Sequence, residues 1–295
     1  MFQADPVVAG LLLGFLIFIC LGWGPGTHLW GALQVIEHCR NEKNKSKGAG
    51  LILQHTDPFL YGAIAADLIS FKRFGGLKNH CHNWNMKERM APLLRSPEAE
   101  AFALGYLCHL AADIGSHNFF VPYHRLVDLP PPVLGHAYWE SRADATLEEH
   151  HWELIEDLRQ RESFRAFDEI IDRAVEIKAL SISSNRLIFR TLVLAQGSPA
   201  WRKARRMLQK RPNRRELNTE LLQILKRKMI LDMLSVVHDK NWRTLLAQDP
   251  LGRIPLRAAR VLRRQLLVQY GNREAALPVA RRLARDCFWP PENIS

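Results

Sequence analysis

The chain has 295 residues, 47% of them hydrophobic, and a formal net charge of +11. This composition excludes a chain without a packed core and allows one large domain or two smaller ones. Residues 151–295 carry 29 Lys and Arg against 16 Asp and Glu, whereas 11 of the 12 histidines lie at or before residue 151. The two halves are therefore expected to differ in role. A basic surface favours anionic partners such as phospholipid headgroups or nucleic acid, although a solubilising helical surface is an equally good interpretation.

The first segment is apolar from Val7 to Gly22. This run is short for a membrane span and long enough for the core of a signal peptide. We predict cleavage before Trp23 and a secreted or cell-envelope (periplasmic) protein. Because residues 1–6 contain no Lys or Arg, an uncleaved anchor through residues 7–22 remains an alternative.

Two helices are predicted next. Residues 24–28 read as a stiff turn, with Thr27 as N-cap and His28 in the first turn of a helix that continues to Cys39. An exposed polar loop follows over residues 41–48. The second helix, residues 57–71, has Asp67 as its one interior acid, which must cap, pair or act chemically if it is buried.

The central element is a helix that starts at Ser96-Pro97-Glu98 and carries His109, Asp113 and His117. A spacing of four residues places these three side chains on one helical face, where they form a potential ligand set for zinc. The loop before this helix holds two more histidines, at positions 80 and 82, of which one is expected to be a ligand.

A helix from about residue 134 repeats the pattern, with His136 and Glu140 four residues apart. Asp144, Glu148 and the histidines at 150 and 151 are interpreted mostly as surface residues. Beyond residue 153 only amphipathic helices are predicted, over residues 165–180, 184–195, 201–210, 216–238, 253–270 and 273–287. The sequence contains no Gly-rich phosphate loop, nucleophile elbow or Cys-x2-Cys pair.

Taken together, the candidate ligands are too many for one tetrahedral ion, which needs about three protein ligands when catalytic. A cluster of two or three Zn²⁺ ions fits the number better. The candidates are Trp23, His28, Asp67, His80 or His82, His109, Asp113, His117, His136 and Glu140.

Five motifs follow one another along the chain: Trp-Gly-x-x-Thr-His, an isolated helical Asp, a His shortly before Trp, His-x3-Asp and His-x3-Glu. This ordered set resembles the bacterial zinc-dependent phospholipases C. It also resembles the related single-strand-specific zinc nucleases and the N-terminal domain of glycosylphosphatidylinositol-specific phospholipase D. The resemblance covers residues 23–149. It implies an all-α, zinc-dependent phospholipase C or nuclease-like helical bundle with additional C-terminal helices.

The resemblance also implies a role for each residue. His82, His109 and Asp113 would hold one zinc, and His117, His136 and Glu140 a second. A third would be bound by His28, by Asp113 as a bridge, and by Trp23 through its amino group and carbonyl, while Asp67 would be the acid beside the attacking water. In the secreted phospholipases C the histidine after the bridging Asp comes six residues later; here position 119 is Phe and His117 comes four later, as in the phospholipase D branch. His124 and His80 therefore stay as alternatives to His117 and His82.

These observations predict a leader or anchor over residues 1–22, a catalytic domain over residues 23–152 and a basic helical region over residues 153–295. The expected activity is zinc-dependent hydrolysis of phosphodiesters, with phospholipids as substrate and membrane contact through the basic half. The alternatives are a single-strand nuclease, for which nucleic acid would be the partner, and a metal-stabilised binding protein without catalysis.

Overall fold

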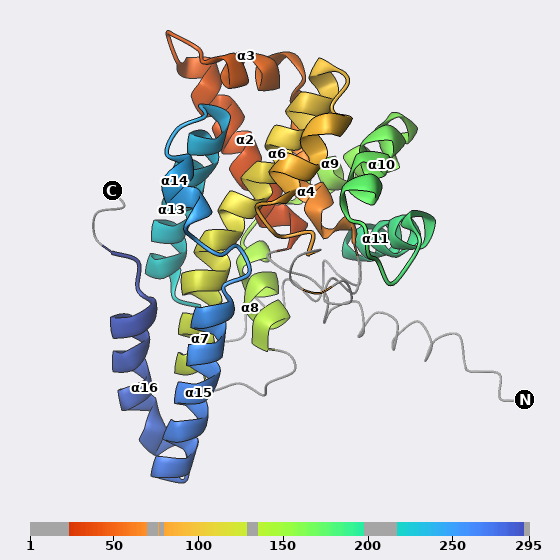
Figure 1. The fold of residues 1–295 in the computed structure, drawn as a ribbon. Coiled ribbons are helices and arrows are strands. Elements are labelled where there is room, and N and C mark those ends of the chain that lie inside the picture. The colour runs from red at the N-terminus through yellow and green to blue at the C-terminus, as the bar shows by residue number, and fades with distance from the viewer. Residues whose placement is uncertain (1–23, 70–75, 77–79, 129–134, 198–216, 292–295) are drawn as a thin grey trace, which may run out of the picture.

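The computed structural model describes residues 24–69, 76, 80–128, 135–197 and 217–291, and every regular element within these ranges is a helix (Figure 1). The predicted all-α class is confirmed. The helices are α2 (Pro25–Asn41), α3 (Lys47–Gln54), α4 (Thr56–Ala65), η1 (Ala66–Leu68), α5 (Met86–Met90), η2 (Ala91–Leu93), α6 (Pro97–Gly115), η3 (Ser116–Phe120), α7 (Val121–Val127), α8 (Gly135–Asp144), α9 (Glu149–Gln160), η4 (Glu162–Phe164), α10 (Arg165–Ala174), α11 (Ile182–Gly197), α13 (Thr219–Val237), α14 (Trp242–Leu246), α15 (Arg253–Tyr270) and α16 (Arg273–Phe288).

Helix α6 runs through the middle of the bundle, with α2, α4 and α13 packed around it. Its start follows the predicted signals: Ser96 accepts a hydrogen bond from the amide of Ala99, and Pro97 occupies the first helical position. From Gly105 to Gly115 every residue of α6 is buried, including its polar ones. This helix therefore carries its histidine and acid into the centre of the protein.

The crossing of α4 and α6 is close because each helix has a glycine at the contact. A Cβ added to Gly62 would lie 2.0 Å from the carbonyl oxygen of Phe102, and one added to Gly105 would lie 2.0 Å from that of Phe59. Any side chain at either position would push the backbones apart. The crossing places η1, which follows α4, directly beside the buried face of α6.

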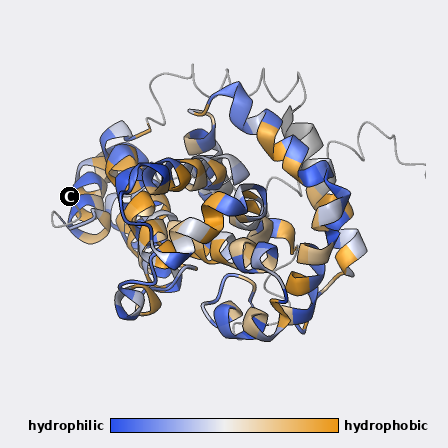
Figure 2. Cartoon of the chain, turned by 90° about the horizontal axis from the view of Figure 1, so that it is seen from above, coloured by the Kyte–Doolittle hydropathy of each residue, from blue (hydrophilic) through white to orange (hydrophobic). Residues whose placement is uncertain are grey.

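The basic second half of the chain packs into the same cores as the first half. Met229 and Met233 of α13 belong to the main core with residues of α2, α4 and α6. A second core joins Phe120 and Trp139 to Leu266 of α15 and Phe288 of α16. The helices carry hydrophobic and hydrophilic residues side by side, as amphipathic helices do (Figure 2).

Several predicted bounds need correction. Helix α2 begins at Pro25 with Gly24 as N-cap, so Thr27 lies inside the first turn. The predicted 57–71 helix ends as α4 at Ala65 and tightens into a 3-10 turn that contains Asp67. The helix expected over residues 165–180 ends at Ala174, whereas the bounds expected for α15 are those observed. Residues 1–23 and the helix predicted over 201–210 lie outside the described residues. Among the helices described, none is long and apolar enough to span a membrane.

Candidate metal centre

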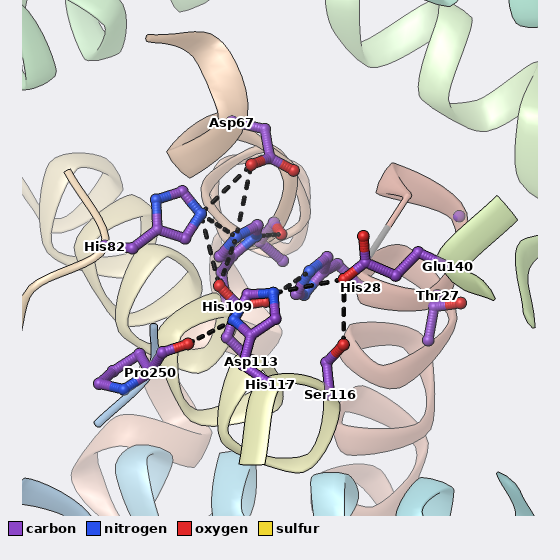
Figure 3. A network of polar contacts seen from close by, with 12 residues as sticks. Thr27, His28, Asp67, His82, His109, Asp113, Ser116, His117, Glu140 and Pro250 are labelled. Carbon is purple, nitrogen blue, oxygen red and sulfur yellow. Dashed lines mark hydrogen bonds and ion pairs between the residues drawn. The ribbon is translucent and has the colours of Figure 1, made fainter. Parts of the chain in front are cut away.

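The candidate metal centre is built around Asp113, whose side chain is completely buried on α6 (Figure 3). Its two carboxylate oxygens face different histidines. Oδ2 lies 3.4 Å from Nε2 of His82 and 3.5 Å from Nε2 of His109, whereas Oδ1 lies 3.4 Å from Nε2 of His28. The geometry of one carboxylate between two sets of imidazoles is what a bridging ligand requires.

The first group consists of His82, His109 and Asp113, whose ligand atoms all lie within 4.8 Å of one another. The Nε2 atoms of the two histidines are 3.0 Å apart. His109 donates from Nδ1 to the carbonyl oxygen of Ala63, 2.9 Å away, which directs Nε2 into the group. The tight α4–α6 crossing supplies that carbonyl.

Asp67 lies at the edge of this group, on η1. One of its oxygens is 3.2 Å from Nε2 of His82 and 4.0 Å from Nε2 of His109. The side chain is buried. The interior acid expected from the sequence thus faces the histidines directly.

The second group consists of His117, His136 and Glu140. Oε1 of Glu140 lies 3.3 Å from Nε2 of His117 and 3.0 Å from Nε2 of His136, and it also accepts a hydrogen bond from Ser116. Nδ1 of His117 lies 2.5 Å from the carbonyl oxygen of Pro250, which fixes the ring orientation. His109 and His117 therefore serve different groups, although both belong to one polar stripe of the sequence.

The step between the two groups is made by a π-helical turn, η3, in which His117 is the second residue. The amide of Val121 bonds to the carbonyl of Ser116, five residues back, instead of four. A straight α-helix was expected here. Turns of this kind occur often at functional sites, and this one sets the direction of His117.

His28 completes the arrangement from α2. Its ring stacks on that of His109, with centroids 3.6 Å apart and an interplanar angle of 12°. Burial and the neighbouring His109 lower the pKa of His28, which favours the neutral imidazole that a metal binds. Trp23, the remaining predicted ligand, lies outside the described residues.

The charges of the site favour cations. Burial alone would raise the pKa of Asp113, but His117 and His109 hold it well below its usual range. Burial alone would lower the pKa of His117, but Asp113 and Glu140 raise it to about 9. Buried carboxylates that stay ionised need positive charge beside them, and either protonated histidines or metal ions can supply it.

An independent test of metal binding is whether buried polar atoms lack partners. Among the described residues no hydrogen bond is made to either oxygen of Asp113, to Nε2 of His28, to Nε2 of His117 or to Oε2 of Glu140. An unsatisfied buried polar atom costs about 1–3 kcal/mol, so five such atoms pointing into one site are not expected without a ligand. The donor set of imidazole nitrogens and carboxylate oxygens suits zinc.

The structure also separates the alternatives left by the sequence. His80 uses Nδ1 to accept a hydrogen bond from the amide of His82, and it is His82 that reaches Asp113. His124 accepts from the amide of Asn218 at Nε2 and bonds to the carbonyl of Phe120 through Nδ1. With both ring nitrogens used in this way, His124 is a structural residue, and it belongs to neither group.

Asp144 was expected at the surface and is instead buried. Its carboxylate accepts hydrogen bonds from the amides of Gly26 and Thr27 and from the Thr27 hydroxyl. Burial raises the pKa of Asp144 to about 7, against the effect of these hydrogen bonds. This contact holds the first turn of α2, and with it His28, against α8. The signal in the sequence was its position four residues after Glu140 on the same helical face.

His151, at the start of α9, is also buried, whereas Glu148 and His150 are exposed as expected.

In a comparison with known families, a family described as "Zinc dependent phospholipase C" matches residues 27–185, which is more than half of the chain. No curated protein and no solved structure matches the sequence. The matched segment includes His28, Asp67 and both groups of candidate ligands described above.

Proposed function

Because this chain belongs to the zinc-dependent phospholipase C family, we propose that it is a zinc-dependent hydrolase that cleaves the phosphodiester bond of phospholipids. The observation that carries the proposal is the shared carboxylate of Asp113, with His82 and His109 at one oxygen and His28 at the other. Such sharing supports two or more ions held side by side. Clusters of this kind act on phosphodiesters by holding both the attacking and the leaving oxygen.

The proposed ligands follow from the contacts, except Trp23, which follows from the resemblance to the family. His82, His109 and Asp113 hold the first ion, and His117, His136 and Glu140 hold the second. His28 and the other oxygen of Asp113 hold a third, together with the amino group and carbonyl of Trp23 after cleavage of the leader. When bound, zinc supplies positive charge that acidifies water and stabilises the developing charge on phosphoryl oxygens.

The protein contributes orientation and proton transfer. Asp67 accepts the proton of the attacking water, because one oxygen of its buried carboxylate lies 3.2 Å from Nε2 of His82, at the edge of the first group. The carbonyl oxygens of Ala63 and Pro250 hold the tautomers of His109 and His117. Burial of the site keeps these charges effective, since bulk water does not screen them.

The surface that would meet a lipid bilayer is the pair of helices α15 and α16. It carries nine arginines against two acids. Along the exposed face of α15, Ile254, Val261 and Val268 recur at intervals of seven residues and are 82%, 44% and 85% exposed. Apolar residues in one line between arginines suit the interface of an anionic membrane. Helix α15 starts three residues after Pro250, whose carbonyl oxygen contacts His117, so this surface adjoins the second group of candidate ligands.

Turnover is the direct test. The full chain should release a phosphorylated headgroup from phosphatidylcholine vesicles or from a short-chain soluble analogue, and a chelator should abolish the release. Asp67→Asn should retain zinc and lower kcat by 10²-fold or more, as expected for loss of a general base. Unchanged turnover in this variant would contradict the role of Asp67.

Binding to vesicles tests the proposed membrane-binding surface independently of catalysis. Val261→Asp should weaken sedimentation with anionic vesicles and leave turnover of the soluble analogue unchanged; equal binding by the variant and the unsubstituted protein would contradict this surface. Degradation of single-stranded DNA or RNA that falls with salt, without release of headgroups, would favour a nuclease. Zinc binding without turnover of either substrate would favour a binding protein.

We also propose that the protein is exported and that the mature chain starts at Trp23. Sequencing of the N-terminus and measurement of zinc test this together. A start at Trp23 should accompany about three ions. A protein that keeps Met1 should hold only the two ions of the two groups.

A further inference from the structure

A third group of metal-ligating side chains lies away from the centre described above. Cys39 is in the last turns of α2, Glu42 follows that helix directly, and His238 directly follows α13. Their sulfur, oxygen and nitrogen atoms lie within 4.8 Å of one another. Cys39 is 11 residues beyond His28 on the same helix, which corresponds to about 16 Å along the axis. The group is therefore separate from the candidate catalytic site.

One of the two carboxylate oxygens of Glu42 has no hydrogen-bond partner among the described residues. Its Oε1 lies 2.9 Å from Nε2 of His238 and 3.6 Å from Nε2 of His38. The other oxygen, Oε2, is buried. The ammonium of Lys45 is nearby, but it donates to the carbonyl oxygens of Arg40 and Glu42. A buried carboxylate oxygen beside a thiol and an imidazole is a position that a cation would satisfy.

The imidazole is already oriented as in many metal sites. Oγ of Ser46 lies 2.8 Å from Nδ1 of His238 and also caps α3 by accepting the amide of Ala49. A hydrogen bond at Nδ1 leaves Nε2 as the atom that can bind a metal. Ser46 is itself fixed by its capping contact, so the ring of His238 is held from outside the group.

The distances suit zinc. Ligand atoms of a tetrahedral zinc stand about 3.3–3.8 Å apart, given bonds of about 2.0–2.3 Å. Oε1 of Glu42 lies 2.9 Å from Nε2 of His238, and the ligand atoms of all three residues lie within 4.8 Å of one another, so small rotations of side chains would suffice. A zinc ion at this position would bind Cys39 as the thiolate, with loss of the thiol proton.

We propose that Cys39, Glu42 and His238 form a separate zinc site, completed by water or by His38, that fastens the end of α2 to the end of α13. This site goes beyond the proposed function and does not depend on it. Its thiolate ligand sets it apart, because the ligands of the candidate catalytic centre are nitrogen and oxygen atoms only. Zinc here would stabilise the fold by linking two helices that both contact α6.

Cobalt gives a direct readout of the thiolate. Full-length protein is stripped with a chelator and titrated with Co²⁺, and the near-ultraviolet absorption of thiolate bound to cobalt is recorded. We expect this band in the unsubstituted protein and its loss in Cys39→Ser. Cys81→Ser and Cys287→Ser are the controls, since Cys81 adjoins the ligand His82 and Cys287 is exposed; both should keep the band.

Absence of the band in the unsubstituted protein, or its loss only in Cys81→Ser or Cys287→Ser, would overturn the proposal. Because Cys39 is fully buried, His238→Gln serves as a second variant, with circular dichroism to verify the fold. It should also lose the band, and zinc content should fall by one ion per chain. Ser46→Ala keeps all three ligands and should bind cobalt about 10-fold more weakly. Unaltered affinity and zinc content in His238→Gln would likewise refute the site.

Discussion

Substitution of Gly252 by alanine tests how the basic second half supports the metal centre. Gly252 precedes α15 and has a φ of 54°, in the left-handed region. A Cβ at this position would lie 2.1 Å from the carbonyl oxygen of His117 and 2.4 Å from its carbonyl carbon. Two residues earlier, Pro250 provides the carbonyl oxygen that lies 2.5 Å from Nδ1 of His117. One side chain would therefore disturb both the backbone and the ring of this predicted ligand.

The expected magnitude has two parts. Alanine in the left-handed region costs about 1–2 kcal/mol. The backbones must also separate by about 1.3 Å before the contact with His117 reaches an ordinary 3.4 Å, and a shift of that size lengthens the bond to Pro250 beyond hydrogen-bonding distance. Loss of that bond adds about 1 kcal/mol. We expect Gly252→Ala to lower the free energy of unfolding by about 2–3 kcal/mol and to weaken zinc at the second group about 10–100-fold.

Urea unfolding and zinc titration measure these two effects, and Gly271→Ala is the matched control. Gly271 has a φ of 68°, and no described atom lies within 4 Å of the Cβ that would be added. Its substitution carries the conformational cost alone, so it should destabilise the fold by about 1–2 kcal/mol and leave zinc affinity unchanged. Equal effects of the two substitutions on stability and on zinc would refute the reasoning.

Two further predictions follow from buried side chains. Asp113→Asn should release more zinc than His109→Gln, measured by metal analysis, because the carboxylate faces two sets of histidines; equal losses would argue against a bridge. Burial lowers the pKa of His124 to about 3, so below its unfolded pKa of about 6.5 the unfolded chain binds the extra proton. Unfolding free energy should therefore fall by about 2 kcal/mol between pH 7.5 and 5 from this residue, and His124→Gln should remove that part of the dependence. An unchanged pH profile would contradict it.

Local sequence determined much of the site. The spacing of His109, Asp113 and His117 on an apolar helix, and of His136 and Glu140 on the next, could be read directly, because residues four apart share a helical face whatever the rest of the fold does. The bounds of α15 were also local, since Gly252 and Gly271 flank an uninterrupted amphipathic pattern. These features depend on neighbours within one or two turns.

Tertiary structure decided which groups meet. The π-helical turn at Ser116–Phe120 turns His117 toward Glu140, and no local signal marked it. Asp144 is buried because the first turn of α2 happens to end against it, 117 residues away in the chain from Thr27. Pro250 acts through its carbonyl oxygen, a group that every residue has, so sequence could not single it out.

The role of the basic half shows the same division. Its helices and charge were evident from sequence, but not that α13, α15 and α16 complete both cores, nor that Pro250, shortly before α15, contacts the ring of His117. Helical periodicity specifies which face of an element is apolar, and it does not specify which other face will cover it. The sequence by itself determined the helices and the candidate ligands that each one carries; only the tertiary structure decided that these side chains meet in groups, with Asp113 between His28 and the pair His82 and His109.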